Sequence, residues 1–337
     1  MKRVAVVGAG SFGTAVAVHA ARAGCAVTLW ARRPEAAADL ERQHRNERYL
    51  PEAELPSAVA MTTELAAVAD ADVLVMAVPS HGFREVLRGV LACWPRGREL
   101  PVVSATKGIE FEALARMSEV SAEECGRAGI PLRFAVLSGP SFAAELALGV
   151  PTAAVIASAN EAYARSLQGT LSTRELRLYT SADVVGVELA GAAKNVIAIA
   201  AGVVSGLGFG QNTLAALITR GLHEITRLGL AYGGQQQTFY GLAGLGDLVL
   251  TCTGDASRNR RAGLALAAGQ PVAELERDTG QVAEGVRTSR AIASLAERLE
   301  VEMPICEQMV AVLYGGKPVR RALEELMLRE LKSEATL

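Results

Sequence analysis

Lys194 is the residue whose surroundings in the sequence most clearly suggest chemistry. It lies in an almost uncharged segment, Val187 to Ala198. On a helix, its four neighbours on the same face are all small: Ala190, Gly191, Ala198 and Ala201. Such an amine can reach into a cavity, where loss of water lowers the pKa of a lysine and makes it a proton donor and acceptor. The alternative is a lysine that reaches solvent from a helix edge.

A glycine-rich run over residues 241–260 carries two further groups of polar residues. Asp247 and Thr251 are four residues apart, so they share a face if this stretch is helical, and the carboxylate could orient an ammonium such as that of Lys194. Three consecutive donors then form a group suited to phosphate, because a guanidinium matches phosphate oxygens in a forked geometry: Ser257, Arg258 and Asn259. A glycine-rich loop with a helix cap is the structural alternative.

Two more polar segments each follow a predicted strand. Lys107 comes just after the strand at 101–105, at a carboxyl end that opens on the ligand crevice in open α/β sheets, and could meet an anionic or carbonyl substrate. Gly139 and Ser141 follow the strand at 133–138 and offer backbone amides beside a hydroxyl. A solvated loop lysine and a plain structural turn are the alternatives.

The motif Gly8-Ala9-Gly10-Ser11-Phe12-Gly13 directly follows a strand pattern and begins a helix pattern. In this context the three glycines permit a tight turn, close approach of amides to a pyrophosphate, and close packing of helix on strand. The start of the helix adds partial positive charge. The motif therefore predicts a dinucleotide site, and a plain tight turn is the weaker alternative.

The end of the second strand favours NADPH over NADH. A carboxylate there would bind the ribose hydroxyls of NAD, but the stretch reads Leu29-Trp30-Ala31-Arg32-Arg33. Arg32 and Arg33 could instead pair with a 2′-phosphate through charge-assisted hydrogen bonds, unless they are merely solvated loop charges. The glycine-flanked turn at 280–285 could also face the cofactor, although an ordinary loop fits its spacing equally well.

The elements that must position these residues divide into two kinds. Short β-branched runs alternate with Ala-rich helical stretches in the first part, which predicts a mostly parallel sheet covered by helices: strands at 3–7, 26–30, 72–78, 101–105, 133–138, 153–157 and 175–180. After about Asp183 the pattern is helical, over 184–204, 213–228, 289–299 and 320–332. We expect a Rossmann-like domain at 1–182, an all-α domain at 183–337 and an active site in the cleft between them.

Composition excludes several classes of partner. The 34 basic and 36 acidic residues give a net charge of −2, without the positive surface that attracts nucleic acid or anionic membranes. The five cysteines are far apart, so neither a metal site nor a disulfide framework is expected. The start of the chain lacks the features of a signal peptide, and the apolar segment 196–204 is too short to span a bilayer. We expect a cytoplasmic protein that acts on a small molecule.

Six segments in register resemble the NAD(P)-dependent glycerol-3-phosphate dehydrogenases of the bacterial type: GAGSFGTA, SATKGIE, SGPSFAAE, ELAGAAKNVIAIAAG, GLAGLGDLVLTCTGDASRNRRAG and QVAEGVRT. The resemblance spans essentially the whole chain. It implies reduction of dihydroxyacetone phosphate to glycerol 3-phosphate with NADP or NAD, in the supply of glycerophospholipid precursors. It also implies a helical domain of the 6-phosphogluconate dehydrogenase C-terminal type and a homodimer.

The resemblance also assigns roles to individual residues. Lys194 is then the proton donor in reduction and the acceptor in the reverse direction, with Asp247, Thr251 and Lys107 as further catalytic candidates. The substrate ligands it implies are Lys107, Gly139, Ser141, Lys194, Asn195, Asp247, Ser257, Arg258 and Asn259. The cofactor ligands it implies are Gly8, Gly10, Ser11, Phe12, Gly13, Arg32, Arg33, Lys107, Ala143, Arg258, Val282 and Glu284. One departure is Ala283, where the family more often has a larger aliphatic residue.

Two alternatives stay open at this point. One is another dehydrogenase with a dinucleotide domain followed by helices, such as a ketopantoate reductase or a β-hydroxyacid dehydrogenase, which should lack the phosphate group at 257–259. The other is a non-catalytic NADPH-binding sensor, which has no need for a proton donor at Lys194. The four histidines lie outside the segments assigned to catalysis or binding, so we expect packing or surface roles for them. The role of His81, which follows the strand at 72–78, stays open.

Overall fold

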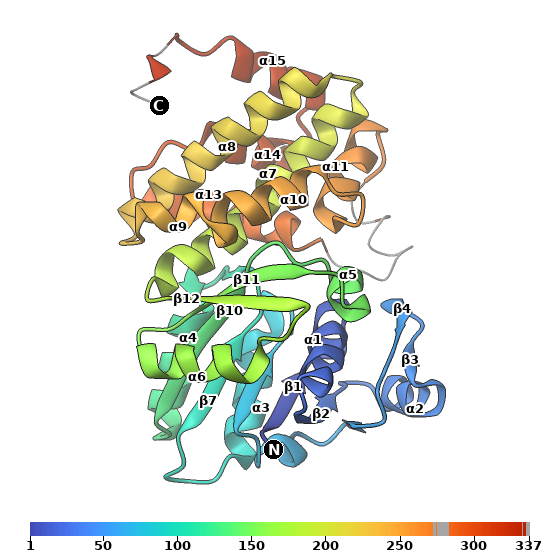
Figure 1. Cartoon of the computed structure of the whole chain (residues 1–337). Coiled ribbons are helices and arrows are strands. Elements are labelled where there is room, and N and C mark those ends of the chain that lie inside the picture. The colour runs from blue at the N-terminus through green and yellow to red at the C-terminus, as the bar shows by residue number, and fades with distance from the viewer. Residues whose placement is uncertain (272–273, 275–282, 332, 335–337) are drawn as a thin grey trace. The chain divides into compact units, whose positions relative to one another are not determined.

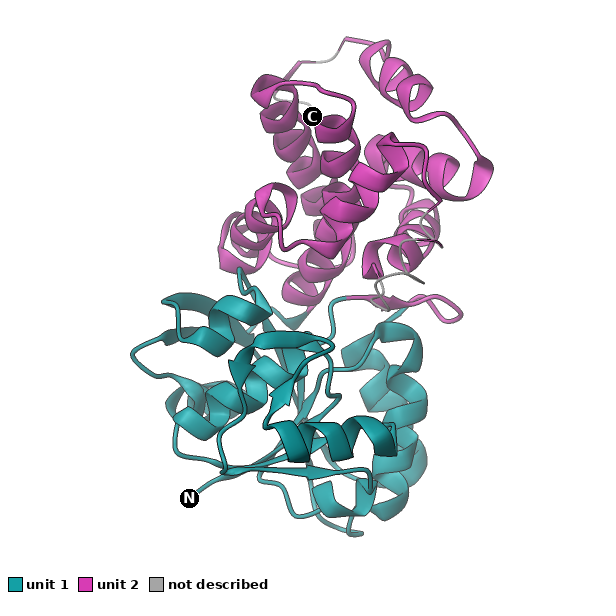
Figure 2. Ribbon diagram, turned by 90° about the vertical axis from the view of Figure 1, so that its right-hand side faces the viewer, with its two compact units in different colours: residues 1–107, 115–184 teal, residues 108–114, 185–337 magenta. Residues whose placement is uncertain are grey.

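The computed structural model describes residues 1–271, 274, 283–331 and 333–334. The chain divides into two compact units, which Figure 2 colours teal and magenta. Unit 1 comprises residues 1–107 and 115–184, and unit 2 comprises residues 108–114 and 185–337. The first unit contains the eight-stranded sheet, and the second is built mainly from helices.

Unit 1 is organised around an eight-stranded sheet with the strand order β12-β11-β10-β7-β6-β1-β2-β5. Neighbouring strands are parallel except for β10 and β11, which are antiparallel. The strands of this sheet are β1 (Arg3–Val7), β2 (Ala26–Trp30), β5 (Val59–Thr62), β6 (Val73–Met76), β7 (Leu100–Ser104), β10 (Leu132–Ser138), β11 (Thr152–Ala157) and β12 (Leu176–Ser181). The short strands outside it are β3 (Arg45–Asn46), β4 (Leu50–Glu54), β8 (Ile109–Glu110) and β9 (Ala115–Arg116).

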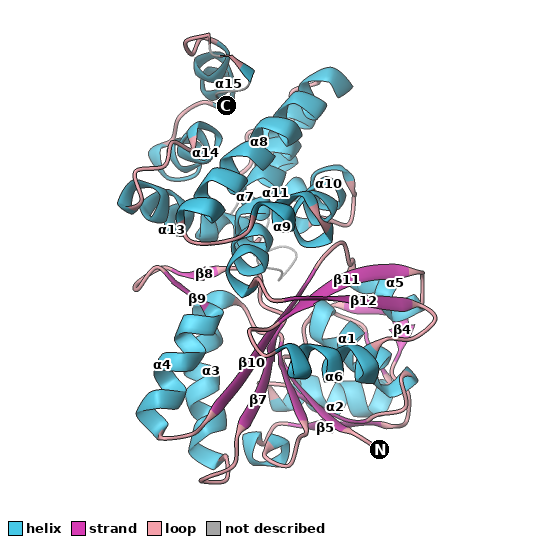
Figure 3. Ribbon diagram, turned by 60° about the vertical axis from the view of Figure 1, so that its left-hand side comes forward, coloured by secondary structure: helices cyan, strands magenta, loops and turns pink. Residues whose placement is uncertain are grey.

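Helices cover both faces of this sheet (Figure 3). Successive residues of β1 alternate between the two layers, with Val4 and Val6 in one core and Ala5 and Val7 in the other. One layer holds α1 (Ser11–Arg22), α2 (Pro34–Gln43), α5 (Ala143–Leu148) and α6 (Glu161–Leu171). The other holds a 3₁₀ turn (Leu65–Val68), α3 (Ser80–Cys93) and α4 (Met117–Ala128). The predicted mostly parallel sheet covered by helices is confirmed.

Unit 2 is built around α7, a 23-residue helix (Figure 1). Most residues of α7 are buried, and many of them belong to the hydrophobic core of this unit. By length and composition α7 could cross a membrane, but 89% of its most apolar window is buried. The other described helices are α8 (Gln211–Ala231), α9 (Gln236–Tyr240), α10 (Asp247–Thr253), α11 (Arg258–Ala267), α13 (Glu284–Arg298), α14 (Pro304–Gly315) and α15 (Val319–Met327); α7 itself is Val184–Gly206. A single π-helical turn, Leu242–Gly246, precedes α10.

Two glycines bring α7 and α11 into direct backbone contact. A Cβ atom on Gly202 would lie 2.0 Å from the carbonyl oxygen of Arg260, and one on Gly263 would lie 2.0 Å from that of Ile199. Both distances are far below van der Waals contact, so neither position can carry a side chain without moving a helix. The axial register of α7 against α11 is therefore fixed by the backbones themselves.

The segment 108–114 packs with unit 2, whereas the sequence assigned it to the first domain. Ile109 is buried in the helical core, and the guanidinium carbon of Arg290 lies 5.1 Å from the ring centre of Phe111. This excursion consists of only seven residues, and its apolar side chains give no local signal of which core they join. Lys107 is thus the last residue of unit 1 before the chain enters unit 2.

Candidate active site

Lys194 is buried in unit 2 and bonded to two residues of α10. Its ammonium nitrogen lies 2.6 Å from Oδ1 of Asp247 and 2.6 Å from the hydroxyl oxygen of Thr251. Lys194 is 5% exposed and Asp247 is 1% exposed. A charged pair in such surroundings interacts strongly because water screens it little. The structure therefore holds this amine in one orientation, as an ammonium beside a carboxylate.

The glycine-rich run before Asp247 packs closely against the end of α9. Gly244 lies in the π-helical turn, and a Cβ atom there would be 2.1 Å from the carbonyl oxygen of Phe239. The turn ends at Gly246, and α10 begins with Asp247. The helical spacing then places Asp247 and Thr251 on the same face, as the sequence suggested, and the Thr251 hydroxyl also donates to the Asp247 carbonyl oxygen at 2.6 Å. Isolated π-turns of this kind are common at functional sites.

A row of amides connects α7, α11 and the start of α13. Asn259 donates from Nδ2 to Oδ1 of Asn195 at 2.9 Å, and its own Oδ1 accepts from the backbone N–H of Gly285 at 2.9 Å. Asn195 is the residue next to Lys194, and both asparagines are buried. The side chain of Asn259 is thus committed mainly to the protein, so its backbone N–H is the group best placed for a ligand.

The start of α11 has the properties of an anion site. Ser257 is the N-cap residue, and its hydroxyl accepts from the backbone N–H of Arg260 at 3.2 Å. The N–H groups of Arg258 and Asn259, the first two of the helix, have no intrahelical acceptor. The Arg258 side chain is exposed and is attracted by the carboxylate of Glu284, the first residue of α13. Two amides, a helix dipole and a guanidinium thus converge here, which suits a phosphate.

Cys252 lies next to Thr251 but does not have the character of a nucleophile. Its side chain is fully buried, and this burial raises the pKa of the thiol to about 12. The reactive form of cysteine is the thiolate, which is negligible near neutral pH at such a pKa. Among the residues described here, moreover, no three His, Cys, Asp or Glu side chains gather as a metal site would require. Lys194, and not Cys252, is therefore the group suited to proton transfer at this place in unit 2.

In unit 1, the glycine motif forms a tight turn between β1 and α1. Gly8 has φ +120°, and a Cβ atom there would lie 2.5 Å from the carbonyl oxygen of Ala77. A Cβ atom on Gly13 would lie 1.8 Å from the Gly8 carbonyl oxygen, whereas one on Gly10, the N-cap of α1, would meet nothing within 4 Å. The backbone is thus closely packed at the first and third glycines and open at the second. This is the cradle that a pyrophosphate requires at a helix N-terminus.

Lys107 meets the glycine motif and the turn after β10. Its ammonium donates to the carbonyl oxygen of Gly139 at 3.1 Å and lies 5.9 Å from the ring centre of Phe12. Ser141 donates to the same Gly139 oxygen at 3.0 Å, and Ala143 begins α5 nearby in the chain. These residues follow the carboxyl ends of β1, β7 and β10, where ligands bind in sheets of this kind. The structure therefore gathers the predicted residues of unit 1 at one edge.

Arg32 and Arg33 follow β2, and both are exposed. The structure shows no side-chain hydrogen bond or ion pair for either among the described residues. Ala31, at the end of the strand, is buried and carries no charge. The position that holds a carboxylate in NAD-specific sites is thus apolar, and the two guanidiniums beside it are not bonded to any group in the described part of the chain.

For the remaining predicted residues, the structure gives the position but does not indicate a ligand contact. Glu284 is half-buried at the first position of α13, and Val282 lies outside the described residues. His81 is exposed near the start of α3. The Ser11 hydroxyl donates to the carbonyl oxygen of Tyr49 at 2.7 Å, so the backbone N–H of Ser11 is its better group for a cofactor.

Sequence reasoning missed Asn46, a buried residue of β3. Its side chain donates to the carbonyl oxygen of Ala9, inside the glycine motif, at 3.1 Å. No local pattern could have indicated this contact, because it joins residues 37 positions apart and Asn46 stands in a highly charged stretch.

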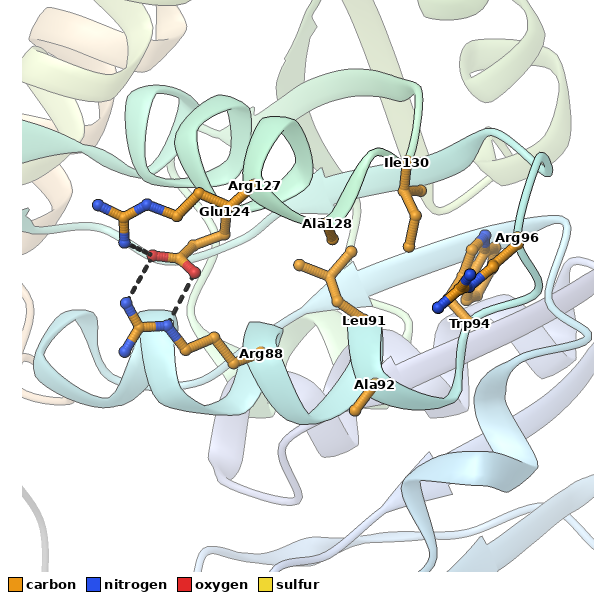
Figure 4. A pocket seen from close by; sticks show the side chains of 9 residues that line it. All are labelled: Arg88, Leu91, Ala92, Trp94, Arg96, Glu124, Arg127, Ala128 and Ile130. Carbon is orange, nitrogen blue, oxygen red and sulfur yellow. Dashed lines mark hydrogen bonds and ion pairs between the residues drawn. The ribbon is translucent and has the colours of Figure 1, made fainter.

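A cavity of about 390 Å³ lies elsewhere on unit 1, between α3 and α4 (Figure 4). On its wall, Glu124 is 4% exposed and accepts from Arg88 at 2.7 Å and from Arg127 at 3.2 Å. The hydrogen bond from Arg88, followed by that from Arg84, lowers the pKa of Glu124 to about 2. The wall residues Trp94 and Ile130 precede β7 and β10, so this cavity is at the amino-terminal edge of the sheet. It contains none of the predicted site residues.

Comparison with known proteins agrees with this geometry. The family model for the N-terminus of NAD-dependent glycerol-3-phosphate dehydrogenase matches residues 3–164, and the model for the C-terminus matches residues 183–324. A glycerol-3-phosphate dehydrogenase [NAD(P)+] from Geobacter sp. (strain M21) is 49% identical over 99% of both chains. The crystal structure of glycerol-3-phosphate dehydrogenase from Coxiella burnetii has a TM-score of 0.92 at 38% identity, covering 97% of this chain and 99% of that one.

A more distant structure shares only the fold. A ketopantoate reductase from Ralstonia eutropha has a TM-score of 0.58 at 17% identity, covering 96% of this chain and 99% of that one. Both halves of the family model and relatives of nearly equal length instead point to one family. The chain belongs to the NAD-dependent glycerol-3-phosphate dehydrogenase family.

Proposed function

We propose that this protein catalyses the reversible NAD(P)H-dependent reduction of dihydroxyacetone phosphate to sn-glycerol 3-phosphate. One observation carries the proposal: a single helical unit holds a buried, oriented ammonium, Lys194, and a helix N-terminus with an adjacent guanidinium, Arg258. These two groups match the two ends of a phosphorylated ketone, since one can protonate an oxygen and the other can bind a phosphate. The names of the relatives support the same substrate pair.

In this proposal, Lys194 gives a proton to the carbonyl oxygen as charge develops there. Asp247 and Thr251 fix the amine, and the carboxylate stabilises its charged form before the proton leaves. In the reverse direction the neutral amine accepts the proton of the alcohol. The contribution of the protein is to position this donor and to keep its surroundings dry.

The phosphate is held by the start of α11 in this proposal. The free N–H groups of Arg258 and Asn259, with the Arg258 guanidinium, bind the phosphate oxygens, and Ser257 shapes the turn before them. Binding energy from this remote group holds the carbonyl in place for the reaction. Lys107, Gly139 and Ser141 are further candidates for contact with the substrate.

The residues of unit 1 fit a nicotinamide dinucleotide. The open backbone at Gly10 and the free N–H groups at the start of α1 suit its pyrophosphate, and Phe12 and Lys107 line the same edge. When bound, the reduced cofactor supplies the hydride for the carbonyl carbon. The reaction requires that this carbon, held through its phosphate, meet the cofactor while Lys194 faces the oxygen.

We expect a preference for NADPH that depends on Arg32 and Arg33. Replacing either by alanine should weaken NADPH binding by about 10-fold, in the range of a lost charge-assisted hydrogen bond, and should leave NADH binding almost unchanged. The Michaelis constants for both cofactors measure this. Arg42→Ala is a matched control, because Arg42 is an exposed arginine of α2 that pairs with Asp39. Equal losses with NADPH and NADH would show that these arginines do not read the 2′-phosphate.

The proposed activity is tested by mixing the protein with NADPH and dihydroxyacetone phosphate and following the nicotinamide absorbance. Oxidation of NADPH that depends on this substrate supports the proposal. Ketopantoate and unphosphorylated dihydroxyacetone are the comparison substrates, and faster turnover with ketopantoate would favour that other dehydrogenase class. NADPH binding without turnover of any of the three would instead favour the sensor.

The broader setting of the enzyme is also part of the proposal. The family resemblance supports a homodimer, a cytoplasmic location and a role in glycerophospholipid precursor supply. These three points stay predictions, as does the assignment of residues 1–182 and 183–337 as the two functional domains.

A further inference from the structure

We infer that Asn46 is a positioning residue for the cofactor, because it fixes the orientation of the Ala9–Gly10 peptide in the glycine turn. The inference rests on the proposed function only in taking a dinucleotide as the ligand of that turn. It concerns a residue outside the glycine motif, on the β3–β4 hairpin, which the fold brings back over the start of α1.

The side-chain amide of Asn46 is fully used by this contact. Nδ2 donates to the Ala9 carbonyl oxygen at 3.1 Å and to the Thr14 hydroxyl oxygen at 2.7 Å, and Oδ1 accepts from the backbone N–H of Tyr49 at 3.2 Å. These partners leave one orientation of the amide, since a carbonyl can only accept and an N–H can only donate. Asn46 is 5% exposed and Thr14 is fully buried, so water cannot replace the lost bonds easily.

The planarity of the peptide group links this contact to the ligand. In a trans peptide, the C=O of one residue and the N–H of the next point in opposite directions. Holding the Ala9 oxygen towards Asn46 therefore turns the Gly10 N–H away from Asn46. Gly10 is also the position where a Cβ atom would meet nothing within 4 Å, so its backbone has room for a ligand. Asn46 thus presents a backbone donor at the turn without touching the ligand itself.

A second contact keeps the hairpin in register with α1. The Ser11 hydroxyl donates to the Tyr49 carbonyl oxygen at 2.7 Å, and the Tyr49 N–H is held by Asn46. The turn at residues 46–49 is thereby closed over the first turn of α1 from both sides. Asn46 therefore links the Ala9–Gly10 peptide of the glycine turn to Tyr49 of the hairpin turn.

The test is Asn46→Leu, which keeps a similar volume, adds no charge and removes both donations. We expect the dissociation constant for NADPH, measured by nucleotide fluorescence, to rise about 30-fold, since turning the Gly10 N–H away from the pyrophosphate removes one hydrogen bond to a charged group, a loss of that order. The value of kcat at saturating NADPH and the KM for dihydroxyacetone phosphate should stay within about 3-fold of wild type. Thermal melting by circular dichroism reports the folded fraction separately.

Two control variants separate positioning from general packing. Glu54→Gln removes the pair of Arg45 Nη2 with Glu54 Oε1, 3.1 Å long, from the same hairpin without touching the glycine turn, and should leave NADPH affinity unchanged. Thr14→Val removes only the second of the two donations of Asn46 and should weaken NADPH binding by less than about 3-fold. A Thr14→Val loss as large as that of Asn46→Leu would overturn the role of the Ala9 peptide.

The outcomes also distinguish this inference from the proposed reaction. If folded Asn46→Leu binds NADPH as tightly as wild type, or if it only melts earlier, the positioning role is wrong. Because NADPH binding is measured without substrate, the positioning role can hold even if the wild-type protein does not reduce dihydroxyacetone phosphate. Conversely, activity of the wild-type protein on that substrate does not test the role of Asn46, which is tested only by the NADPH affinity of the Asn46→Leu variant.

Discussion

Replacing Lys194 by alanine is expected to lower kcat by about 100-fold or more and to leave the affinity for NADPH nearly unchanged. The buried amine is held by Asp247 and Thr251 at 2.6 Å each, so its removal takes away the oriented proton donor and leaves the glycine turn of unit 1 intact. Steady-state kinetics with dihydroxyacetone phosphate and direct NADPH binding measure the two quantities.

Control variants distinguish loss of the proton donor from loss of the folded state. Removing Lys194 leaves Asp247 as a buried charge without its partner, which destabilises a protein strongly. Lys194→Ala/Asp247→Asn removes that charge, so its melting temperature should exceed that of the single variant while its turnover stays low. Lys317→Ala removes another partly buried lysine of unit 2, paired with Glu325 at 2.7 Å, and should retain wild-type turnover. Near wild-type kcat in folded Lys194→Ala would exclude the amine as the proton donor.

Replacing Arg258 by alanine is expected to lower kcat/KM for dihydroxyacetone phosphate by about 10-fold to 150-fold, the equivalent of a hydrogen bond to a charged group. The variant should lose most of its preference for this substrate over unphosphorylated dihydroxyacetone, because in the proposed site only the phosphorylated ketone binds the start of α11. Rates with both substrates give the preference as a ratio of two kcat/KM values.

Arg261→Ala is the matched control for this second prediction, because it removes an equal charge from the same helix three residues further along. Its preference for the phosphorylated ketone should stay within about 3-fold of wild type, the size of a surface electrostatic effect. If Arg258→Ala keeps the wild-type preference, the phosphate is bound elsewhere. If Arg261→Ala loses the preference equally, the general charge of α11 matters more than the guanidinium at 258.

The fold was predictable where short-range pattern and burial coincide. β1 and β2 lie where the apolar runs 3–7 and 26–30 predicted them, because strands buried on both faces read as continuous apolar stretches. β5, Val59–Thr62, was missed: it is a short strand at the edge of the sheet, and it is defined by its pairing with β2 more than by its own residues. The antiparallel direction of β11 likewise depends on the path of the chain after Gly139.

In the candidate site, too, features set by local spacing were predictable, and contacts between distant segments were not. The i, i+4 spacing of Asp247 and Thr251 suggested their shared face, and the structure places both against Lys194. Asn46 could not be found, because hydrogen bonds between segments distant in the sequence leave no periodicity. Ser11 was predicted as a cofactor ligand, and this stays a prediction. The bond of its hydroxyl to Tyr49 is a contact of the same long-range kind.

The contact between Gly202 of α7 and Gly263 of α11 sets a distance as well as a packing. Lys194 stands two turns before the first glycine, and Arg258 stands five residues before the second. With the two backbones touching, the helices cannot slide to lengthen or shorten the distance between Lys194 and the start of α11. If the proposed site is correct, this fixed spacing should select for substrate length. We then expect a phosphorylated ketone with one more carbon between carbonyl and phosphate to engage Lys194 or the start of α11, but not both.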